Sequence, residues 1–328
     1  MRDLYPLVLK PEFSRRPWGA RDLAPVYDMH AHPGEEAIGE AWLTGDKCVV
    51  INGPLAGQRL SDVLNRFGRD LVGTASDDPH RFPLLIKFLF PREKLSVQVH
   101  PDDETAQAMG QPCGKTECWY VLHADPGAKL ALGLKPATTK VQLESAIAEN
   151  RAEELLNWIN VRPGDMFYVD AGTVHAIGPG AILVETQQNS DTTFRLYDYG
   201  RPRELHVSEG LKATKLQTAA GKVWSTSLDG FERLVASSWF VVDKFSLSAQ
   251  RNFAHDGTSV QCLVATQGAG VVEAEGMPPV TIACGDCVVV PAVVREYSIR
   301  PQWQLEFLRS CVPASKVAAP ITELVYTR

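Results

Sequence analysis

The 328-residue sequence has no segment that approaches the ~18 consecutive apolar residues of a transmembrane helix. Its amino-terminal stretch, MRDLYPLVLKPEF, contains no sustained apolar core of the kind that a secretory signal needs. An excess of positive charge is also missing, because the formal net charge is −6 and no basic run reverses it. These absences predict a cytoplasmic protein that binds neither anionic membranes nor nucleic acid.

A disulfide or zinc-knuckle pattern of cysteines is absent as well. The seven cysteines are scattered and odd in number. Cys284 and Cys287 form a CxxC, but no second pair accompanies them, and they lie within a strand-turn-strand pattern. We interpret this CxxC as coincidental and expect a reducing compartment.

The composition is that of an ordinary globular protein, with 45% apolar and 22% charged residues. The length suggests about two domains. Short alternating runs between turn residues dominate, and they predict strands. Two stretches instead have helical spacing, so we expect helices over residues 58–67 and 141–158, the second capped by Thr138 or Thr139.

Metal-ligating residue types gather in and after the stretch LSVQVHPDDETAQAMGQPCGKTECWY, residues 95–120. Gln98 and His100 are two apart in an alternating run, so both side chains project from the same face of a strand. A turn-rich loop then leads to Glu117, which the next strand would bring back beside them. His175 follows the turn signal Asp-Ala-Gly and completes a candidate metal pocket.

Several motifs in this order resemble the type I phosphomannose isomerases in their short bacterial form. They are SVQVHPDDE, GKTECWYVL, DAGTVHAIGPG and ILVETQQNSDTTFRLYDYGR, and the resemblance is dense over residues 10–210. The motif RPWGA departs from the family because Ala20 replaces a usual second glycine. Glu40 and Trp42 match a further family motif, and we interpret both as residues of a sheet.

The resemblance implies a mainly β fold of two cupin-type (jelly-roll) barrels with a few peripheral helices. We expect residues 1–235 to form the catalytic, metal-binding domain. Residues 236–328 would form a second cupin-like domain, in which QGAGVVEA and ACGDCVVVPA are the two halves of the barrel. This region has no QxH…E pattern and His255 stands alone, so we predict that it lacks a metal site and that the chain is a diverged internal duplication.

The resemblance also implies one divalent metal ion per chain. Two imidazoles, a carboxylate and an amide suit Zn²⁺ best, although Fe²⁺, Mn²⁺, Co²⁺ or Ni²⁺ would also fit. The candidate metal ligands are Gln98, His100, Glu117 and His175.

The same comparison suggests the residues that act on the substrate. Arg195, Lys115 and Glu185 are the candidate catalytic residues, with Arg195 near the reacting carbons and Lys115 in proton transfer or phosphate binding. Lys87 and Ser96 would contact the phosphate. Structural alternatives stay open for two of them, because Lys87 could extend its amine to the surface and Arg195 could pair with Asp191 or Asp198.

The implied function is metal-dependent interconversion of mannose 6-phosphate and fructose 6-phosphate by proton transfer between C1 and C2. The partner is thus a phosphorylated hexose, and the chain would be a monomer or a homodimer. One alternative is an Fe(II) cupin oxygenase, because two histidines and a glutamate also form a facial triad. The other is a non-catalytic, sugar-binding cupin.

Overall fold

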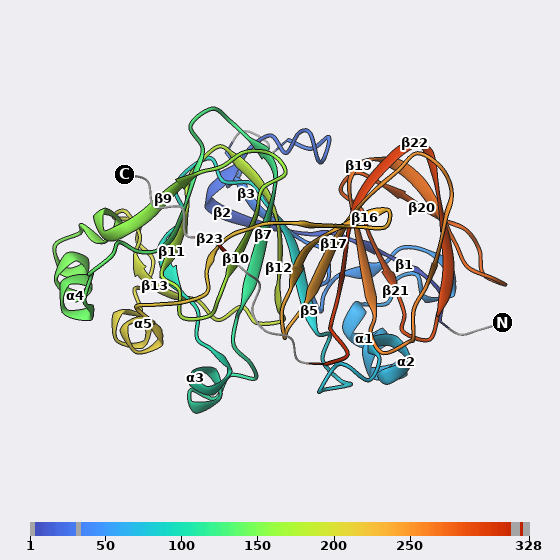
Figure 1. Ribbon diagram of the computed structural model, residues 1–328, viewed down its shortest axis with the longest axis horizontal. Coiled ribbons are helices and arrows are strands. Elements are labelled where there is room, and N and C mark those ends of the chain that lie inside the picture. Colours follow the sequence, from blue (N-terminus) through green and yellow to red (C-terminus); the bar gives the residue numbers. More distant parts are fainter. Residues whose placement is uncertain (1–3, 31–33, 316–321, 324–328) are drawn as a thin grey trace.

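The computed structural model describes residues 4–30, 34–315 and 322–323. Within these residues the strands form three sheets, which we name the outer, central and C-terminal sheets (left, middle and right in Figure 1). The helices are short and lie at the periphery. The predicted mainly β class with a few peripheral helices is therefore confirmed. No helix in the described ranges has the length and apolarity needed to cross a membrane.

Each sheet is built from strands of distant parts of the chain. In spatial order, the outer sheet contains β13 (Phe194–Tyr197), β6 (Val97–Val99), β11 (His175–Ile177), β8 (Lys129–Leu134) and β9 (Leu156–Asn160). The central sheet contains β2 (Glu12–Ala20), β3 (Ile38–Trp42), β5 (Leu84–Leu89), β12 (Ala181–Gln188), β7 (Glu117–Ala124), β10 (Met166–Val169), β14 (Gly221–Val223) and β23 (Thr322–Glu323).

The C-terminal sheet follows the order β15 (Thr226–Leu228), β16 (Phe231–Ala236), β17 (Val241–Leu247), β22 (Glu296–Cys311), β19 (Gln261–Glu273), β21 (Cys287–Val290), β1 (Leu7–Lys10) and β4 (Val49–Val50). Two further strands join it, β18 (Arg251–Ala254) on β22 and β20 (Val280–Ala283) on β19. The helical elements are η1 (Gly53–Leu55), α1 (Leu60–Phe67), α2 (Arg69–Val72), α3 (Asp103–Ala108), α4 (Lys140–Ala148), η2 (Ala152–Leu155) and α5 (Val207–Ala213).

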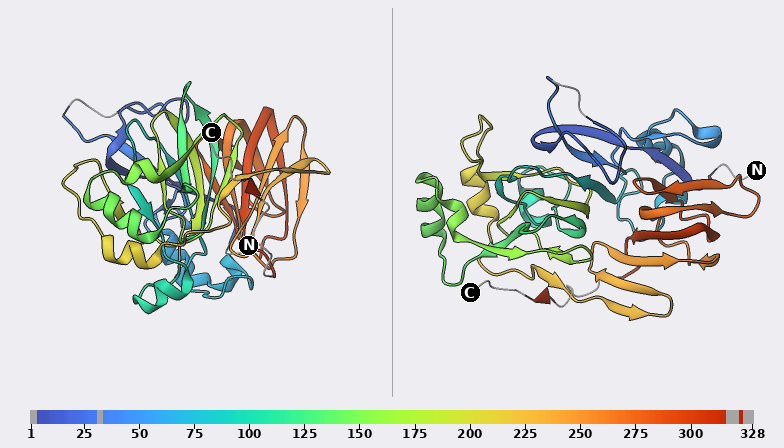
Figure 2. Two further views of the ribbon diagram at one scale, coloured as in Figure 1. Left: turned by 60° about the vertical axis from the view of Figure 1, so that its left-hand side comes forward. Right: turned by 90° about the horizontal axis from the view of Figure 1, so that it is seen from above.

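The central sheet is buried on both faces because its side chains alternate between two cores. Trp119 and Phe167 pack toward the outer sheet, in a core that also contains Leu132. Tyr120 and Tyr168 pack in the other core, which continues into the C-terminal sheet. A strand with both faces covered carries large apolar residues at successive positions, as β7 and β10 do. Figure 2 shows the layers from above.

Strand pairing crosses the expected boundary between residues 235 and 236. Strand β1 pairs with β21, with Leu7 opposite Val289. Strands β4 and β15, which also precede residue 236, belong to the C-terminal sheet, and β16 in the same sheet crosses the boundary itself. The division of the chain into residues 1–235 and 236–328 stays a prediction.

One predicted helix is confirmed and the other is too long. Helix α1 covers all but the first two residues of the stretch 58–67. Helix α4 begins after a Thr139 cap as expected, but it ends at Ala148. Asn150 adopts a φ of 57°, which breaks the helical path, and Trp158 therefore lies in strand β9. After this break Leu155 lies in the short helical turn η2 and Trp158 lies in strand β9, so the apolar spacing does not continue helix α4.

Candidate metal centre and active site

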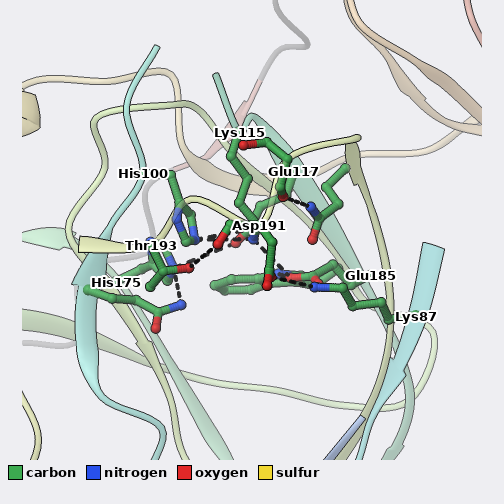
Figure 3. Close-up of polar contacts among 12 residues, drawn as sticks. Lys87, His100, Lys115, Glu117, His175, Glu185, Asp191 and Thr193 are labelled. Carbon is green, nitrogen blue, oxygen red and sulfur yellow. Dashed lines mark hydrogen bonds and ion pairs between the residues drawn. The ribbon is translucent and has the colours of Figure 1, made fainter. Parts of the chain in front are cut away.

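Two histidines and a glutamate meet between the outer and central sheets. His100 directly follows β6, while Glu117 begins β7 and His175 begins β11. The Glu117 carboxylate lies 3.6 Å from the Nε2 atom of each histidine. All three side chains are at most 2% exposed, and Figure 3 shows them converging. Their ligand atoms lie within 4.8 Å of one another, a spacing that one metal ion could bridge.

Backbone carbonyls set the tautomer of both histidines. His100 Nδ1 lies 2.9 Å from the carbonyl oxygen of Thr192, and His175 Nδ1 lies 2.9 Å from that of Thr173. A carbonyl only accepts, so each Nδ1 carries the proton and each Nε2 presents a lone pair to the cluster. Burial, aided by the charge of Lys115, lowers the pKa of His100 well below its ordinary value. Burial also lowers the pKa of His175 to about 4, so both rings are neutral as metal ligation requires.

Glu117 supplies a buried oxygen that lacks a partner. Among the described residues, its Oε1 atom has no hydrogen-bond donor, whereas Oε2 accepts from Lys115. Burial raises the pKa of Glu117, since an ion there is removed from water. A buried, unpaired carboxylate oxygen is costly unless a cation binds it. Beside two imidazole lone pairs, this oxygen fits a divalent metal ion.

Gln98 lies beside the cluster, directly opposite His175 in the pairing of β6 with β11. Its amide nitrogen lies 3.1 Å from His175 Nε2, and its Oε1 accepts a hydrogen bond from Ser96 Oγ at 3.0 Å. Turning the amide by 180° would instead present Oε1 to the cluster. Ser96 thus contacts a candidate ligand, and it is only 3% exposed.

Lys115 links the metal-ligand candidates to a second carboxylate. Its Nζ donates to Glu117, lies 3.2 Å from His100 Nε2, and lies 3.7 Å from Glu185 Oε1. All of these groups are buried, and the lysine is 4% exposed. The His100 Nε2 lone pair that faces Lys115 is not available to a metal ion until Lys115 moves away, whereas Lys115 contacts Glu117 only through Oε2 and leaves Oε1 open.

Lys87 is enclosed and does not reach the surface. It is 2% exposed, and its Nζ lies 3.4 Å from Glu185 and 3.7 Å from Asp191 (Figure 3). Although burial favours the neutral acid, the charges of Lys115 and Lys87 lower the pKa of Glu185. Trp119 Nε1 donates to the same carboxylate at 3.3 Å. Glu185 is therefore held ionised beside the cluster.

Arg195 lies opposite Gln98 in the pairing of β13 with β6, and Gln98 lies opposite His175 in the pairing of β6 with β11. Its Nη1 donates to the Glu204 carbonyl at 2.7 Å, and its buried Nε has no partner among the described residues. The two expected structural partners are used elsewhere: Asp191 pairs with Lys87, and Asp198 pairs with Arg201 and Arg203.

Three residues that we had not assigned to the site form a network on its edge. Glu40 and Trp42 lie in β3, as predicted for sheet residues. The Glu40 carboxylate accepts from Arg16 Nη2 at 2.8 Å and from Trp42 Nε1 at 2.9 Å. The Trp42 ring in turn lies 4.7 Å from Lys87 Nζ. The motifs RPWGA and IGEAW contain these residues, but only the pairing of β2, β3 and β5 brings them together.

A cavity of about 750 Å³ opens beside this network. Its wall includes Arg16, Trp42, Arg81, Asp191 and Thr192. Thr192 is the residue whose carbonyl orients His100, and Asp191 pairs with Lys87. The cavity therefore adjoins the buried charged groups and has the size of a small-molecule site.

The second barrel region contains His255 and the CxxC that we interpreted as coincidental. His255 Nε2 lies 2.8 Å from the Val294 carbonyl, and its Nδ1 accepts from the Gly257 amide. Both ring nitrogens are thus used in backbone hydrogen bonds. Cys284 and Cys287 are both free.

Packed antiparallel sheets with two histidines and a glutamate buried between them define a cupin with a candidate metal centre. Residues 7–129 match the family model "Phosphomannose isomerase type I, catalytic domain". The mannose-6-phosphate isomerase ManA of Bacillus subtilis is 39% identical over 258 residues, which are 74% of this chain and 80% of ManA. The mannose-6-phosphate isomerase of Streptococcus mutans is 36% identical over 89% of this chain and 94% of its own length.

Solved structures of mannose-6-phosphate isomerases are also similar to this chain. The mannose 6-phosphate isomerase of Bacillus subtilis superposes with a TM-score of 0.80 at 30% identity, over 93% of this chain and 99% of that chain. A mutant of phosphomannose isomerase from Salmonella typhimurium shares the fold, with a TM-score of 0.77 at 15% identity over 93% of this chain and 99% of that one. The chain belongs to the type I mannose-6-phosphate isomerases, and it is an enzyme of that family.

Proposed function

We propose that the protein is a metal-dependent aldose-ketose isomerase that interconverts mannose 6-phosphate and fructose 6-phosphate. The observation that carries the proposal is the buried cluster of two histidine Nε2 lone pairs and the Glu117 carboxylate, next to an ionised Glu185. The names of the relatives support the substrate. The phosphorylated hexose would be bound in the cytoplasm by a monomer or a homodimer.

In this proposal His100, Glu117 and His175 would hold one divalent ion, and the Gln98 amide would be the fourth ligand. Zn²⁺ is favoured, because nitrogen donors and a carboxylate are its usual partners. When bound, such an ion polarises a sugar oxygen and stabilises the negative charge that develops next to it. Residues 1–235 supply these ligands, and residues 236–328 contribute most of the sheet that supports the central sheet.

Buried side chains of this chain would move the proton. Glu185 is ionised by its two lysine neighbours and can accept a proton from C2 of the sugar and return it at C1. Lys115 would donate a hydrogen bond to the sugar oxygen that becomes anionic. Arg195 would stabilise the same enediolate charge from the outer sheet. Lys87 and Ser96 would contact the phosphate.

Deuterium at C2 of mannose 6-phosphate tests the proton-transfer route. Turnover in ordinary water should give a primary isotope effect and fructose 6-phosphate that has lost part of its deuterium to solvent. Complete retention of the deuterium at C1 would point to a hydride shift and contradict the proposed route. If the purified, metal-loaded protein forms no fructose 6-phosphate, the proposed function is wrong.

A further inference from the structure

Arg16 presents a guanidinium to the wall of the 750 Å³ cavity, next to the buried charged groups of the active site. We propose that Arg16 binds the phosphate group of the substrate and so determines the preference for a phosphorylated sugar. The inference rests on the proposed function. A guanidinium matches phosphate well, because its planar N–H groups donate in parallel to two phosphate oxygens.

The chain is shaped to hold this side chain in place. A Cβ atom on Gly39 would lie 2.5 Å from Arg16 Cβ and 2.6 Å from its Cγ. Only a glycine at this position of β3 therefore leaves room for the aliphatic part of the Arg16 side chain. Strand β2 is irregular here, because Arg15 and Ala20 both pair with Ile38. The Arg16 guanidinium then meets the Glu40 carboxylate, which is 12% exposed. A side chain held at both its stem and its head is pre-organised for a ligand.

One guanidinium near Arg16, that of Arg195, has no carboxylate partner of its own among the described residues. Burial and the charges of Arg203 and Arg16 lower the pKa of Arg195, although the charges of Asp198 and Glu204 act in the opposite direction. Asp198 pairs with Arg203, and Glu40 pairs with Arg16. Arg195 donates to a carbonyl, and its buried Nε has no partner in the part of the chain that the structure describes. A dianionic phosphate would supply the missing negative charge and partner.

The contacts of Arg16 also continue to the reacting end of the site. Glu40 holds both Arg16 and Trp42, and the Trp42 ring covers Lys87, which pairs with Glu185. A phosphate bound at Arg16 would therefore place the sugar along the wall that leads to Glu185. This arrangement explains why the arginine lies on the cavity wall and not in the metal cluster.

The test compares Arg16→Met and Arg16→Lys with wild type, all loaded with Zn²⁺. Arg15→Met is the matched control, because Arg15 is the adjacent arginine but pairs with the exposed Glu35 at 3.1 Å. Four quantities are measured for each protein: kcat, KM for mannose 6-phosphate, the inhibition constant of inorganic phosphate, and its Kd by calorimetry.

Loss of a charge-assisted hydrogen bond pair should raise KM and both phosphate constants of Arg16→Met by about tenfold or more, with a much smaller effect on kcat. Arg16→Lys should recover part of this loss, and Arg15→Met should behave as wild type. Unchanged phosphate constants in Arg16→Met would overturn the inference. If wild type shows no isomerase activity, the proposed function fails, and calorimetric binding of phosphate by wild type but not by Arg16→Met would still support the anion site.

Discussion

At the residue scale, the buried charges of the active site are arranged as pairs of opposite sign. Lys87 and Glu185 are 2% and 6% exposed and lie 3.4 Å apart, and Lys115 and Glu117 are equally enclosed. Removing one member of a buried pair leaves the other desolvated and unpaired, which costs more than the pair contributes. The stability of the fold and the ionisation of the site are therefore linked through the same side chains.

Replacing Lys87 with methionine should destabilise the protein by about 1–3 kcal/mol, because Glu185 stays buried and loses its closest cation but keeps Lys115 at 3.7 Å. The double variant Lys87→Met with Glu185→Gln should recover a large part of that loss. Urea unfolding of the two variants and wild type measures both effects. A loss below about 1 kcal/mol in Lys87→Met would show that the pair is not enclosed as described.

His255 should make stability depend on pH. Burial lowers its pKa below the ordinary histidine value, and the neutral ring uses both nitrogens in hydrogen bonds. The unfolded chain therefore takes up a proton at a higher pH than the folded chain, and stability falls as the pH drops below about 6.5. Urea unfolding at about pH 8 and about pH 5 should show a smaller loss for His255→Gln than for wild type. Equal losses would contradict this role.

At the element scale, local sequence patterns predict the strands and helices whose formation depends on residues close together in the chain. The alternation around Gln98 and His100 identifies a strand with its polar face toward the site, and the apolar spacing around Leu60 identifies α1. The same reasoning fails beyond Asn150. This residue has a positive φ and ends the path of α4, and Trp158 further along lies in strand β9. Spacing alone does not distinguish a buried strand from a continued helix.

The cap of α4 can be tested independently of the active site. Thr139 accepts from the Gln142 amide, and the Gln142 side chain accepts from the Thr139 amide. Thr139→Ala should cost about 1 kcal/mol in urea unfolding and leave kcat unchanged, since α4 lies on the far side of the outer sheet. Thr138→Ala is the control, and it should cost much less. An equal cost for both substitutions would mean that the capping box does not stabilise the helix.

At the scale of the whole molecule, the arrangement depends on contacts that no local pattern shows. Leu7 pairs with Val289, and Glu40 meets Arg16 only because β2 and β3 are adjacent. The candidate ligands were predictable because strand alternation and the family motifs both mark them. The network of Arg16, Glu40 and Trp42 was not, because its members are polar residues in different strands whose proximity is a property of the sheet.

The two expected domains should unfold together. The core that includes Phe88 and Tyr168 of the central sheet also includes Val289 and Leu308 of the C-terminal sheet. A fragment of residues 1–235 would expose that face to water, so we expect it to be insoluble or to lack cooperative unfolding. Calorimetry of the full chain should show a single transition. A soluble fragment with its own sharp transition would instead support two independent domains.

The most direct test of the account is a zinc titration of the chelated protein, with bound metal and isomerase activity measured in the same samples. We predict that activity rises in proportion to bound zinc and stops at about one ion per chain. Glu117→Gln, which keeps the shape of the side chain but removes its charge, should bind zinc far more weakly and remain inactive. Full activity in metal-free protein, or zinc binding and activity both retained in Glu117→Gln, would contradict the account.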